Sequence, residues 1–346
     1  MRKETRAAFN GYLKRQATLN NLTAEDVSTK FSVTPTVQQS LETAIQESNE
    51  MLKKINVIGV DEMEGEPLLL GVASTIAGRT EITGGAKRDP QYVGALQKDS
   101  YKCEQTNFDT AFPYARLDQW AKFKDFQSRL SNAIAERQGL DRIMIGFNGT
   151  SVAKTTNRST SPLLQDVNIG WLQKVRTVAP DRTITEGVLD SGKVTIGATG
   201  DYKTLDGLVF DAVQLLDPWH RGNPDLIAII PRGMLHSRFL SAVEKGGASN
   251  QEDVAADAIM TRTRIGGLPY FDAPFFPDGK VLITTLSNLS IYYQNEKRRR
   301  HIEDEPKYDR VADYQSSNEA YVIEDMGLVA LVENIEAAAA APVDGG

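Results

Sequence analysis

Cysteine, histidine and long hydrophobic runs are scarce in this chain of 346 residues, which has one cysteine and three histidines. One cysteine cannot form an internal disulfide, so nothing requires an oxidising compartment. The longest aliphatic runs, such as residues 226–230 and 328–332, are far shorter than the roughly 20 residues of a membrane-spanning helix. The basic N-terminus lacks the apolar stretch of about 7–15 residues that a secretory signal needs. We therefore expect a protein of the cytoplasm with no membrane partner.

The same scarcity excludes most motifs of metal and nucleophile sites. His220, His236 and His301 are widely separated, and no His-x-x-x-His or Cys-x-x-Cys spacing occurs. No Gly-x-Ser-x-Gly motif marks a serine nucleophile. Cys103 lies in a predicted strand, where it is expected to be a small buried apolar side chain. The sequence therefore predicts no catalytic residue, no metal site and no cofactor.

One segment has the spacing of a phosphate-binding loop. Residues 187–193 read Gly-Val-Leu-Asp-Ser-Gly-Lys, but Val194 stands where a serine or threonine would hold magnesium. The flanking residues are typical of two strands, whereas a nucleotide site needs a strand leading into a helix. We predict a hairpin with its turn at residues 190–192. An α+β hydrolase or a nucleotide-dependent enzyme using Lys193 or a histidine is the alternative function.

Charge is distributed unevenly along the chain. The 39 Lys and Arg against 46 Asp and Glu give a net charge of −7. Residues 302–346 contain eleven acidic and two basic residues, a net −9, whereas residues 1–30 carry a net +3. Charge blocks of opposite sign favour contacts with other chains or nucleic acid, and two solvated faces are the simpler alternative. Arg298, Arg299 and Arg300 are candidates for such contacts, either with neighbouring subunits or with phosphates.

Helices and strands alternate without a repeating β-α-β period, which favours an α+β fold. Short amphipathic helices are expected before residue 31, and because they have few apolar residues they should dock on a partner or be disordered. A longer helix follows Pro35 as far as Ile55, and a helix of residues 117–138 should stop at Gly139, with a separate structured piece at 140–147. Further elements are expected at the following positions: strand 55–60, helix 204–216, strand 226–230, helix 232–245, and strands 281–284, 289–293, 320–323 and 328–332.

Two predicted strands, residues 68–76 and 101–114, flank a polar tract with Gly84 and Gly85 at its centre. This pattern indicates a long hairpin, and it projects from the body because its tip has almost no apolar side chains to bury. A projecting hairpin is expected to contact another chain. The candidate contact residues at the tip are Gly84, Gly85, Lys87 and Arg88.

Short motifs along the chain resemble one known family. The chain begins Met-Arg-Lys-Glu-Thr-Arg and continues with Phe-Asn-Gly-Tyr-Leu at residues 9–13. Further motifs follow in the same order, namely 26–28, 30–31, 46–48, Asp118, 120–121, 125–127, 132–134, 137–138, 146–149, 164–167, 170–174, 265–269, 288–293 and 321–325. Together they resemble the GpN-type major capsid proteins of Peduovirus-like contractile-tailed phages over essentially the whole chain.

The resemblance implies the capsid fold of tailed double-stranded-DNA phages, with an N-terminal arm, an extended hairpin loop, a peripheral domain with a long spine helix and an axial domain. It implies self-assembly into hexamers and pentamers of an icosahedral head enclosing double-stranded DNA, and no enzyme activity. The implied partners are the scaffolding protein and maturation protease, the portal protein, and DNA through weak non-specific proximity. It also implies removal of the N-terminal segment by a cut near Lys30, Phe31 and Ser32.

The implied division of the chain has six parts. They are a removable assembly segment (1–31), the arm (32–60), the extended loop (61–116), the peripheral domain (117–203), a mainly axial region (204–322), and a closing strand with a flexible tail (323–346). The spine helix is expected at residues 117–138. The implied localisation is the virion, with assembly in the host cytoplasm.

Overall fold

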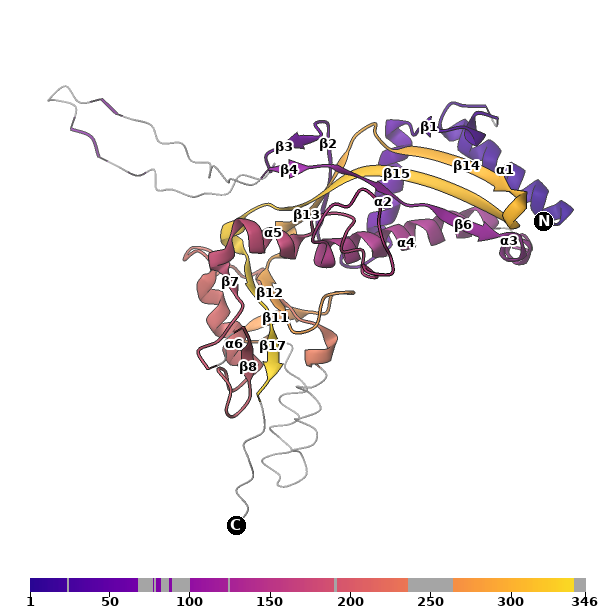
Figure 1. The fold of residues 1–346 in the computed structure, drawn as a ribbon. Coiled ribbons are helices and arrows are strands. Elements are labelled where there is room, and N and C mark those ends of the chain that lie inside the picture. The colour runs from indigo at the N-terminus through magenta and orange to yellow at the C-terminus, as the bar shows by residue number, and fades with distance from the viewer. Residues whose placement is uncertain are drawn as a thin grey trace, which may run out of the picture.

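The structure, a computed structural model, describes residues 1–23, 25–67, 77, 79–81, 87–88, 100–123, 125–189, 192–235 and 264–338. Two bodies are joined at an angle (Figure 1). The upper body contains helices α1 (Lys3–Leu19), α2 (Pro35–Glu47), α3 (Tyr114–Trp120) and α4 (Phe126–Asn148). The lower body contains α6 (Leu205–Ala212), and α5 (Trp171–Val178) lies where the two bodies meet.

A seven-stranded sheet forms the frame of the upper body. Its order is β1-β14-β15-β13-β2, with β5 and β6 also paired to β15. These strands are β1 (Phe31–Ser32), β2 (Asn56–Val60), β5 (Glu104–Asn107), β6 (Thr110–Pro113), β13 (Leu289–Gln294), β14 (Arg299–Glu305) and β15 (Arg310–Ile323). The long strand β15 contacts four others, so strands from both ends of the chain share one sheet.

The lower body is built on a six-stranded sheet of order β10-β11-β9-β12-β16-β7. Its strands are β7 (Thr183–Ile184), β9 (Ile227–Ile229), β10 (Arg264–Ile265), β11 (Leu268–Phe271), β12 (Val281–Thr284) and β16 (Ala330–Val332). Two small sheets pair β3 (Glu64–Gly65) with β4 (Tyr101–Lys102) and β8 (Val194–Ile196) with β17 (Ile335–Ala337). Short 3₁₀ turns occupy residues 26–28, 180–182, 213–215, 286–288, 306–308 and 326–328.

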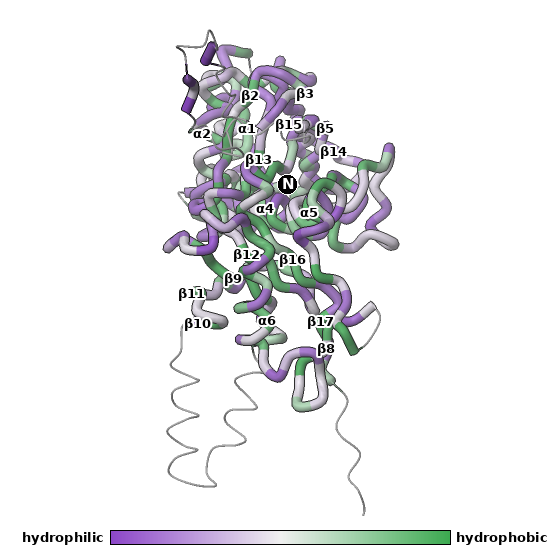
Figure 2. Tube along the Cα trace, turned by 90° about the vertical axis from the view of Figure 1, so that its left-hand side faces the viewer, coloured by the Kyte–Doolittle hydropathy of each residue, from purple (hydrophilic) through white to green (hydrophobic). Residues whose placement is uncertain are grey.

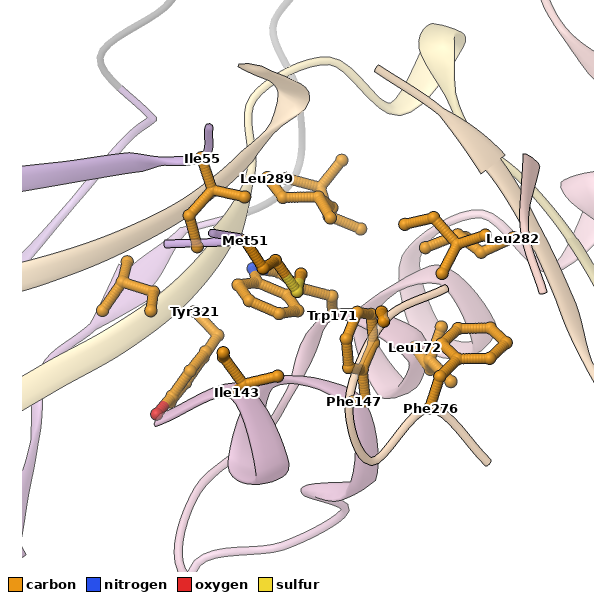
Figure 3. Close-up of a cluster of buried hydrophobic side chains, with 14 of the residues drawn as sticks. Met51, Ile55, Ile143, Phe147, Trp171, Leu172, Phe276, Leu282, Leu289 and Tyr321 are labelled. Carbon is orange, nitrogen blue, oxygen red and sulfur yellow. The ribbon is translucent and has the colours of Figure 1, made fainter. Parts of the chain in front are cut away.

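Apolar side chains fill both bodies and their junction. The tube is coloured hydrophobic through β12 and β16, which have no exposed residue (Figure 2). Around Trp171, side chains from α2, α4, α5 and both large sheets pack into one cluster (Figure 3). The ring of Trp171 meets those of Phe147 and Tyr321 edge-on, with centroids 5.3 and 5.5 Å apart. Because this cluster takes side chains from both sheets, it joins the two bodies.

Several predicted elements form where expected. The α+β class is confirmed, as are the strands at 281–284 and 289–293, and α6 with the turn after it spans the predicted helix 204–216. Thr204 caps α6 by accepting a hydrogen bond from the Gly207 backbone N–H. The predicted helix 232–245 begins at residues 232–235, and the rest of it lies outside the described residues.

The predicted spine helix is wrong in both bounds. It is interrupted between Trp120 and Phe126: the Phe123 backbone N–H donates to the Trp120 carbonyl in a turn, and the Phe123 ring is half-exposed, off the apolar stripe. The second part, α4, runs past Gly139 to Asn148 and includes the piece predicted separately at 140–147. Gly139 is an approach point for α2 instead of a stop, since a Cβ there would lie 2.6 Å from the Ser48 hydroxyl.

Two more predictions need correction. The helix after Pro35 ends at Glu47, where the Ser48 hydroxyl donates to the Ile45 carbonyl, although Met51, Leu52 and Ile55 still reach the core. Residues 190 and 191 of the predicted turn lie outside the described residues, and the Gly187 backbone N–H donates to the Lys193 carbonyl beside it. The strands beyond do not pair with each other, since β7 joins the six-stranded sheet and β8 joins β17. Each strand pairs with a strand far along the chain, and the local sequence pattern cannot specify such a partner.

Candidate functional site

The basic N-terminal segment, defined here as residues 1–31, is docked on the upper body. Phe9, Tyr12 and Ala17 of α1 enter a cluster with Val27 and Phe31. The body contributes Leu117, Leu130, Ile134, Ile302 and Val311 to the same cluster. The segment was expected to dock on a partner or to be disordered, and the structure corrects this, because it packs against its own chain.

Polar contacts hold the start of α1 on the body. Asp118 of α3 accepts hydrogen bonds from the Arg2 backbone N–H (2.9 Å) and the Thr5 hydroxyl (2.5 Å). The Thr5 hydroxyl is the main reason that the pKa of Asp118 is lowered. Arg6 forms an ion pair with Asp304 on β14. The basic front therefore meets part of the acidic rear within one chain.

Arg300 lies beneath α1. Its guanidinium donates to the Asp313 carboxylate at 2.9 and 2.7 Å, to the Gln16 side-chain oxygen at 2.8 Å and to the Tyr12 hydroxyl at 2.5 Å. Burial raises the pKa of Tyr12, which keeps this hydroxyl protonated. Arg300 thus connects a carboxylate of β15 with two side chains of α1.

Arg298 belongs to a second buried cluster. It donates to Glu42 of α2 at 2.7 Å, to Gln138 of α4 at 2.6 Å and to Gln315 of β15 at 3.0 Å. Glu42 also accepts from Arg142, which reaches Glu319 at 2.6 Å. Burial raises the pKa of Glu42, but Arg142 and Arg298 outweigh that effect and the net shift is downward.

The two clusters form one buried network. Gln315 donates to Asp313 at 3.0 Å, and so links the partners of Arg298 with those of Arg300. The network contains three guanidinium groups and three carboxylates, so their charges balance. Buried charges are tolerated when they are paired and hydrogen-bonded in this way. Its members are Glu42, Arg142, Arg298, Arg300, Asp313 and Glu319.

Two of the three arginines predicted as intersubunit contacts are therefore misassigned. Arg298 is fully buried and Arg300 is 9% exposed, and each donates to side chains of its own chain. Only Arg299 is exposed. Adjacent side chains of a strand point to opposite faces, which explains why one residue of the run differs from its neighbours.

Sequence reasoning also missed the acidic and amide partners of these arginines. One signal was present: Gln38 and Glu42 lie on the same helical stripe as Ile45, and all three are buried. A glutamate on an apolar stripe indicates a buried positive partner. The identity of that partner is not in the local pattern, since Arg142 and Arg298 are 100 and 256 residues away.

The predicted cutting region lies at the edge of the seven-stranded sheet. Phe31 pairs with Arg300 and Ser32 with Arg299 in antiparallel register. Phe31 is buried, whereas Lys30 and Ser32 are exposed. Lys30 and Arg299 line a hollow of about 410 Å³ beside this edge.

Of the predicted loop tip, Gly84 and Gly85 lie outside the described residues, and Lys87 and Arg88 are exposed. The first predicted strand of the hairpin, residues 68–76, also lies outside the described residues, and β3 just before it pairs with β4 in antiparallel register. The rest of the second predicted strand, 101–114, is corrected: it forms β5 and β6, which pair with β15 of the seven-stranded sheet. Whether the tip contacts a neighbouring chain stays a prediction.

Among the residues that the structure describes, the features that suggested an enzyme do not assemble into a site. Lys193 pairs with Glu336 at 2.9 Å, and β8 follows it, where a phosphate-binding loop requires a helix. The Nε2 atom of His220 lies 3.0 Å from Oδ2 of Asp325, and that of His301 lies 3.4 Å from Oε2 of Glu303. His236 is outside the described residues. In the described part of the chain, no group of three metal-binding side chains occurs and no helix is apolar and long enough to span a membrane.

Comparisons with known proteins identify the family. The model of the P2 family of phage major capsid proteins matches residues 8–335. The chain is 46% identical to the capsid proteins of Escherichia phage P2, over 97% of this chain and 96% of that protein. It is 42% identical to the major capsid protein of Serratia phage KSP20, over 97% of both chains.

Solved structures agree with these relatives. A chain of the procapsid of satellite phage P4, which includes the size determination protein, superposes with a TM-score of 0.80 at 43% identity, covering 98% of this chain and 99% of that one. The capsid of a native GTA particle has a TM-score of 0.51 at 14% identity, over 84% of this chain and 91% of that one, and supports the fold alone. These relatives are structural proteins, which decides against the enzyme alternative. The chain belongs to the P2 family of phage major capsid proteins.

Proposed function

We propose that this capsid protein self-assembles into the hexamers and pentamers of an icosahedral phage head that encloses double-stranded DNA. The observation that carries the proposal is the 43% identity and TM-score of 0.80 to a procapsid chain, over 98% of the sequence. Assembly would take place in the host cytoplasm, and the virion is the final location. The mechanism is geometric, because symmetry repeats the same contacts between copies.

The two bodies correspond to the peripheral and axial domains in this proposal. The peripheral domain takes α4 as its spine helix and includes β13, β14 and β15, which the implied boundaries had placed in the mainly axial region 204–322. The axial domain then contains the six-stranded sheet with α6. Residues 32–60 serve as the arm, 61–116 as the extended loop, and 323–346 as the closing strand and tail.

The proposed partners are other copies of this chain, the scaffolding protein and maturation protease, the portal protein and packaged DNA. Contact with DNA is weak and independent of sequence, because the net charge is −7 and two of the three clustered arginines are buried. An isotherm for duplex DNA at several salt concentrations tests this. A steep salt dependence, with a slope that falls by about one in Arg299→Ala, would contradict weak proximity.

Proteolytic processing near Phe31 is the second part of the proposal. Removing residues 1–31 would remove a net +3 and leave the mature chain at about −10. The exposed Lys30 and Ser32 flank the proposed cut. Intact-mass measurement of particle-derived protein tests it: loss of about 31 N-terminal residues is expected, and an intact N-terminus contradicts processing.

Electron microscopy tests the assembly itself. The chain would be produced with and without its scaffolding protein and protease, and we expect closed shells of capsomers when the scaffolding protein is present. A chain that stays a small soluble species under every condition would refute the proposed function.

A further inference from the structure

We propose that the face beneath α1 is a docking site that continues to hold the N-terminal segment non-covalently after the chain has been cut near Phe31. The cut itself rests on the proposed function. The docking depends only on contacts between described residues. The partner that fits this face is a basic amphipathic helix with a tyrosine and a glutamine four residues apart.

The apolar part of the site is a packed interior. Phe9 and Tyr12 are each 2% exposed and Ala17 is 4% exposed, although all three lie on a surface helix. An isolated helix of this length with few apolar residues has little stability in water. The helical order of α1 therefore depends on the face that it covers, and the segment gains its structure by docking.

The polar part of the site selects the occupant. Tyr12 and Gln16 are one helical turn apart, so both side chains face the body and both accept from Arg300. Arg300 is held in place by two hydrogen bonds to Asp313. Hydrogen bonds from an ionised donor are about twice as strong as neutral ones, and a buried one is costly to leave unmade.

The basic residues of α1 add complementary charge at its start. Arg6 pairs with Asp304, and the Arg2 backbone N–H and Thr5 hydroxyl donate to Asp118. An acidic residue in place of Arg6 would put a carboxylate against Asp304. The face thus distinguishes a basic helix from an acidic one.

A cut near Phe31 would break none of these contacts. The residues of α1 that touch the body end at Ala17, and Val27 of the intervening turn is itself buried in the same cluster. Cutting removes only the tether and its contribution to the effective concentration of α1. The cut segment is therefore a bound ligand of its own subunit until something displaces it.

The test uses the full chain with a site-specific protease sequence, flanked by Gly-Ser pairs, inserted between the exposed Thr29 and Lys30. The folded chain is cut to completion and applied to size-exclusion chromatography at micromolar concentration, with intact mass measured on each fraction. We expect the fragment to elute with the body. A fragment that elutes separately from the body overturns the proposal.

Variants of the N-terminal segment test which of its contacts hold the cut fragment on the body. Tyr12→Phe removes the hydroxyl that accepts from Arg300 and should speed release by roughly ten- to a hundredfold. Phe9→Ala should abolish retention. Lys14→Ala alters an exposed residue of the same helix and should behave like the parent. The rate of release is measured by repeating the chromatography at increasing times after cutting, and a rate that is equal in Tyr12→Phe and the parent would overturn the role of Arg300.

The outcome of the docking experiment is independent of the outcome of the processing test. The engineered cut replaces the natural one, so a released fragment refutes docking without bearing on natural cleavage. An intact N-terminus in particles refutes natural cleavage and leaves the docking result unchanged.

Discussion

The indole ring of Trp171 lies directly against the backbone of Gly146. A Cβ atom at residue 146 would be 2.3 Å from the nearest ring atom. Trp171 is fully buried, and its Nε1–H donates to the Ser290 carbonyl at 3.0 Å, so the ring cannot move away without losing that bond. This contact fixes α5 against α4 and β13 at the junction of the two bodies.

Gly146→Ala should therefore destabilise the subunit by about 1–3 kcal/mol or more, since extra atoms in a packed interior force side chains and backbone to shift. Thermal unfolding of the purified subunit would show this as a lowered Tm. Gly207→Ala is the matched control, because Gly207 also lies in a helix and its nearest neighbour is the Thr204 hydroxyl at an ordinary 3.6 Å. That control should be neutral or stabilising by up to ~1 kcal/mol. An equal loss in both variants would contradict the steric argument.

The helices show which part of the fold can be predicted from the sequence: the position of α4 can, and the residues at which it begins and ends cannot. The apolar period located α4 through Leu130 and Ile134, both buried as expected. The C-terminal bound was wrong because a glycine in a helical pattern can either end the helix or let a neighbouring element approach. Gly139 lies inside the helix and lets α2 approach, whereas Gly149 ends it: a Cβ there would be 2.2 Å from the Asn168 carbonyl oxygen. Only the packing partners distinguish the two.

The candidate site was less predictable for a related reason. The run Arg298 to Arg300 was interpreted as one charged patch, although a strand turns alternate residues to opposite faces. The partners of Arg300 come from positions 12, 16 and 313, and no local pattern brings these together. The basic front and its docking helix were visible in the sequence, but the face that binds it was not.

Arg142→Met should be strongly destabilising, by about 3–5 kcal/mol, because it leaves Glu42 and Glu319 as buried carboxylates with fewer partners. Urea unfolding followed by circular dichroism would measure the loss. Arg129→Met removes an exposed ion pair with Asp125 and should cost no more than about 1 kcal/mol. If both substitutions cost the same, the network contributes no more than a surface pair.

Asp201→Asn should change how stability depends on pH. The Asp201 carboxylate accepts hydrogen bonds from the Thr195 hydroxyl and from the backbone N–H groups of Leu189 and Thr195, and these lower its pKa to about 2. The unfolded value is about 3.9, so the stabilisation is complete above that pH and is lost as pH falls toward 2.

The wild-type chain should therefore have a higher Tm than Asp201→Asn at pH 7, and the difference should shrink as the pH falls from about 4 through 2. Parallel thermal scans across this range would measure it. The exposed Asp181→Asn is the charge-matched control and should show no such convergence. A Tm difference between wild type and Asp201→Asn that stays constant with pH would contradict the assignment.

Cys103 should be unreactive in the folded subunit. It is fully buried, and burial, with smaller contributions from Glu319 and Glu104, raises its pKa to about 12. Because the thiolate is the reactive species, a chromogenic disulfide reagent at pH 8 should find almost no thiol until denaturant is added. It should then release one equivalent of chromophore per chain, since the sequence has a single cysteine. Cys103→Ser sets the background in both states. A native chain that reacts as fast as the denatured one would show that the segment joining β4 and β5 opens readily.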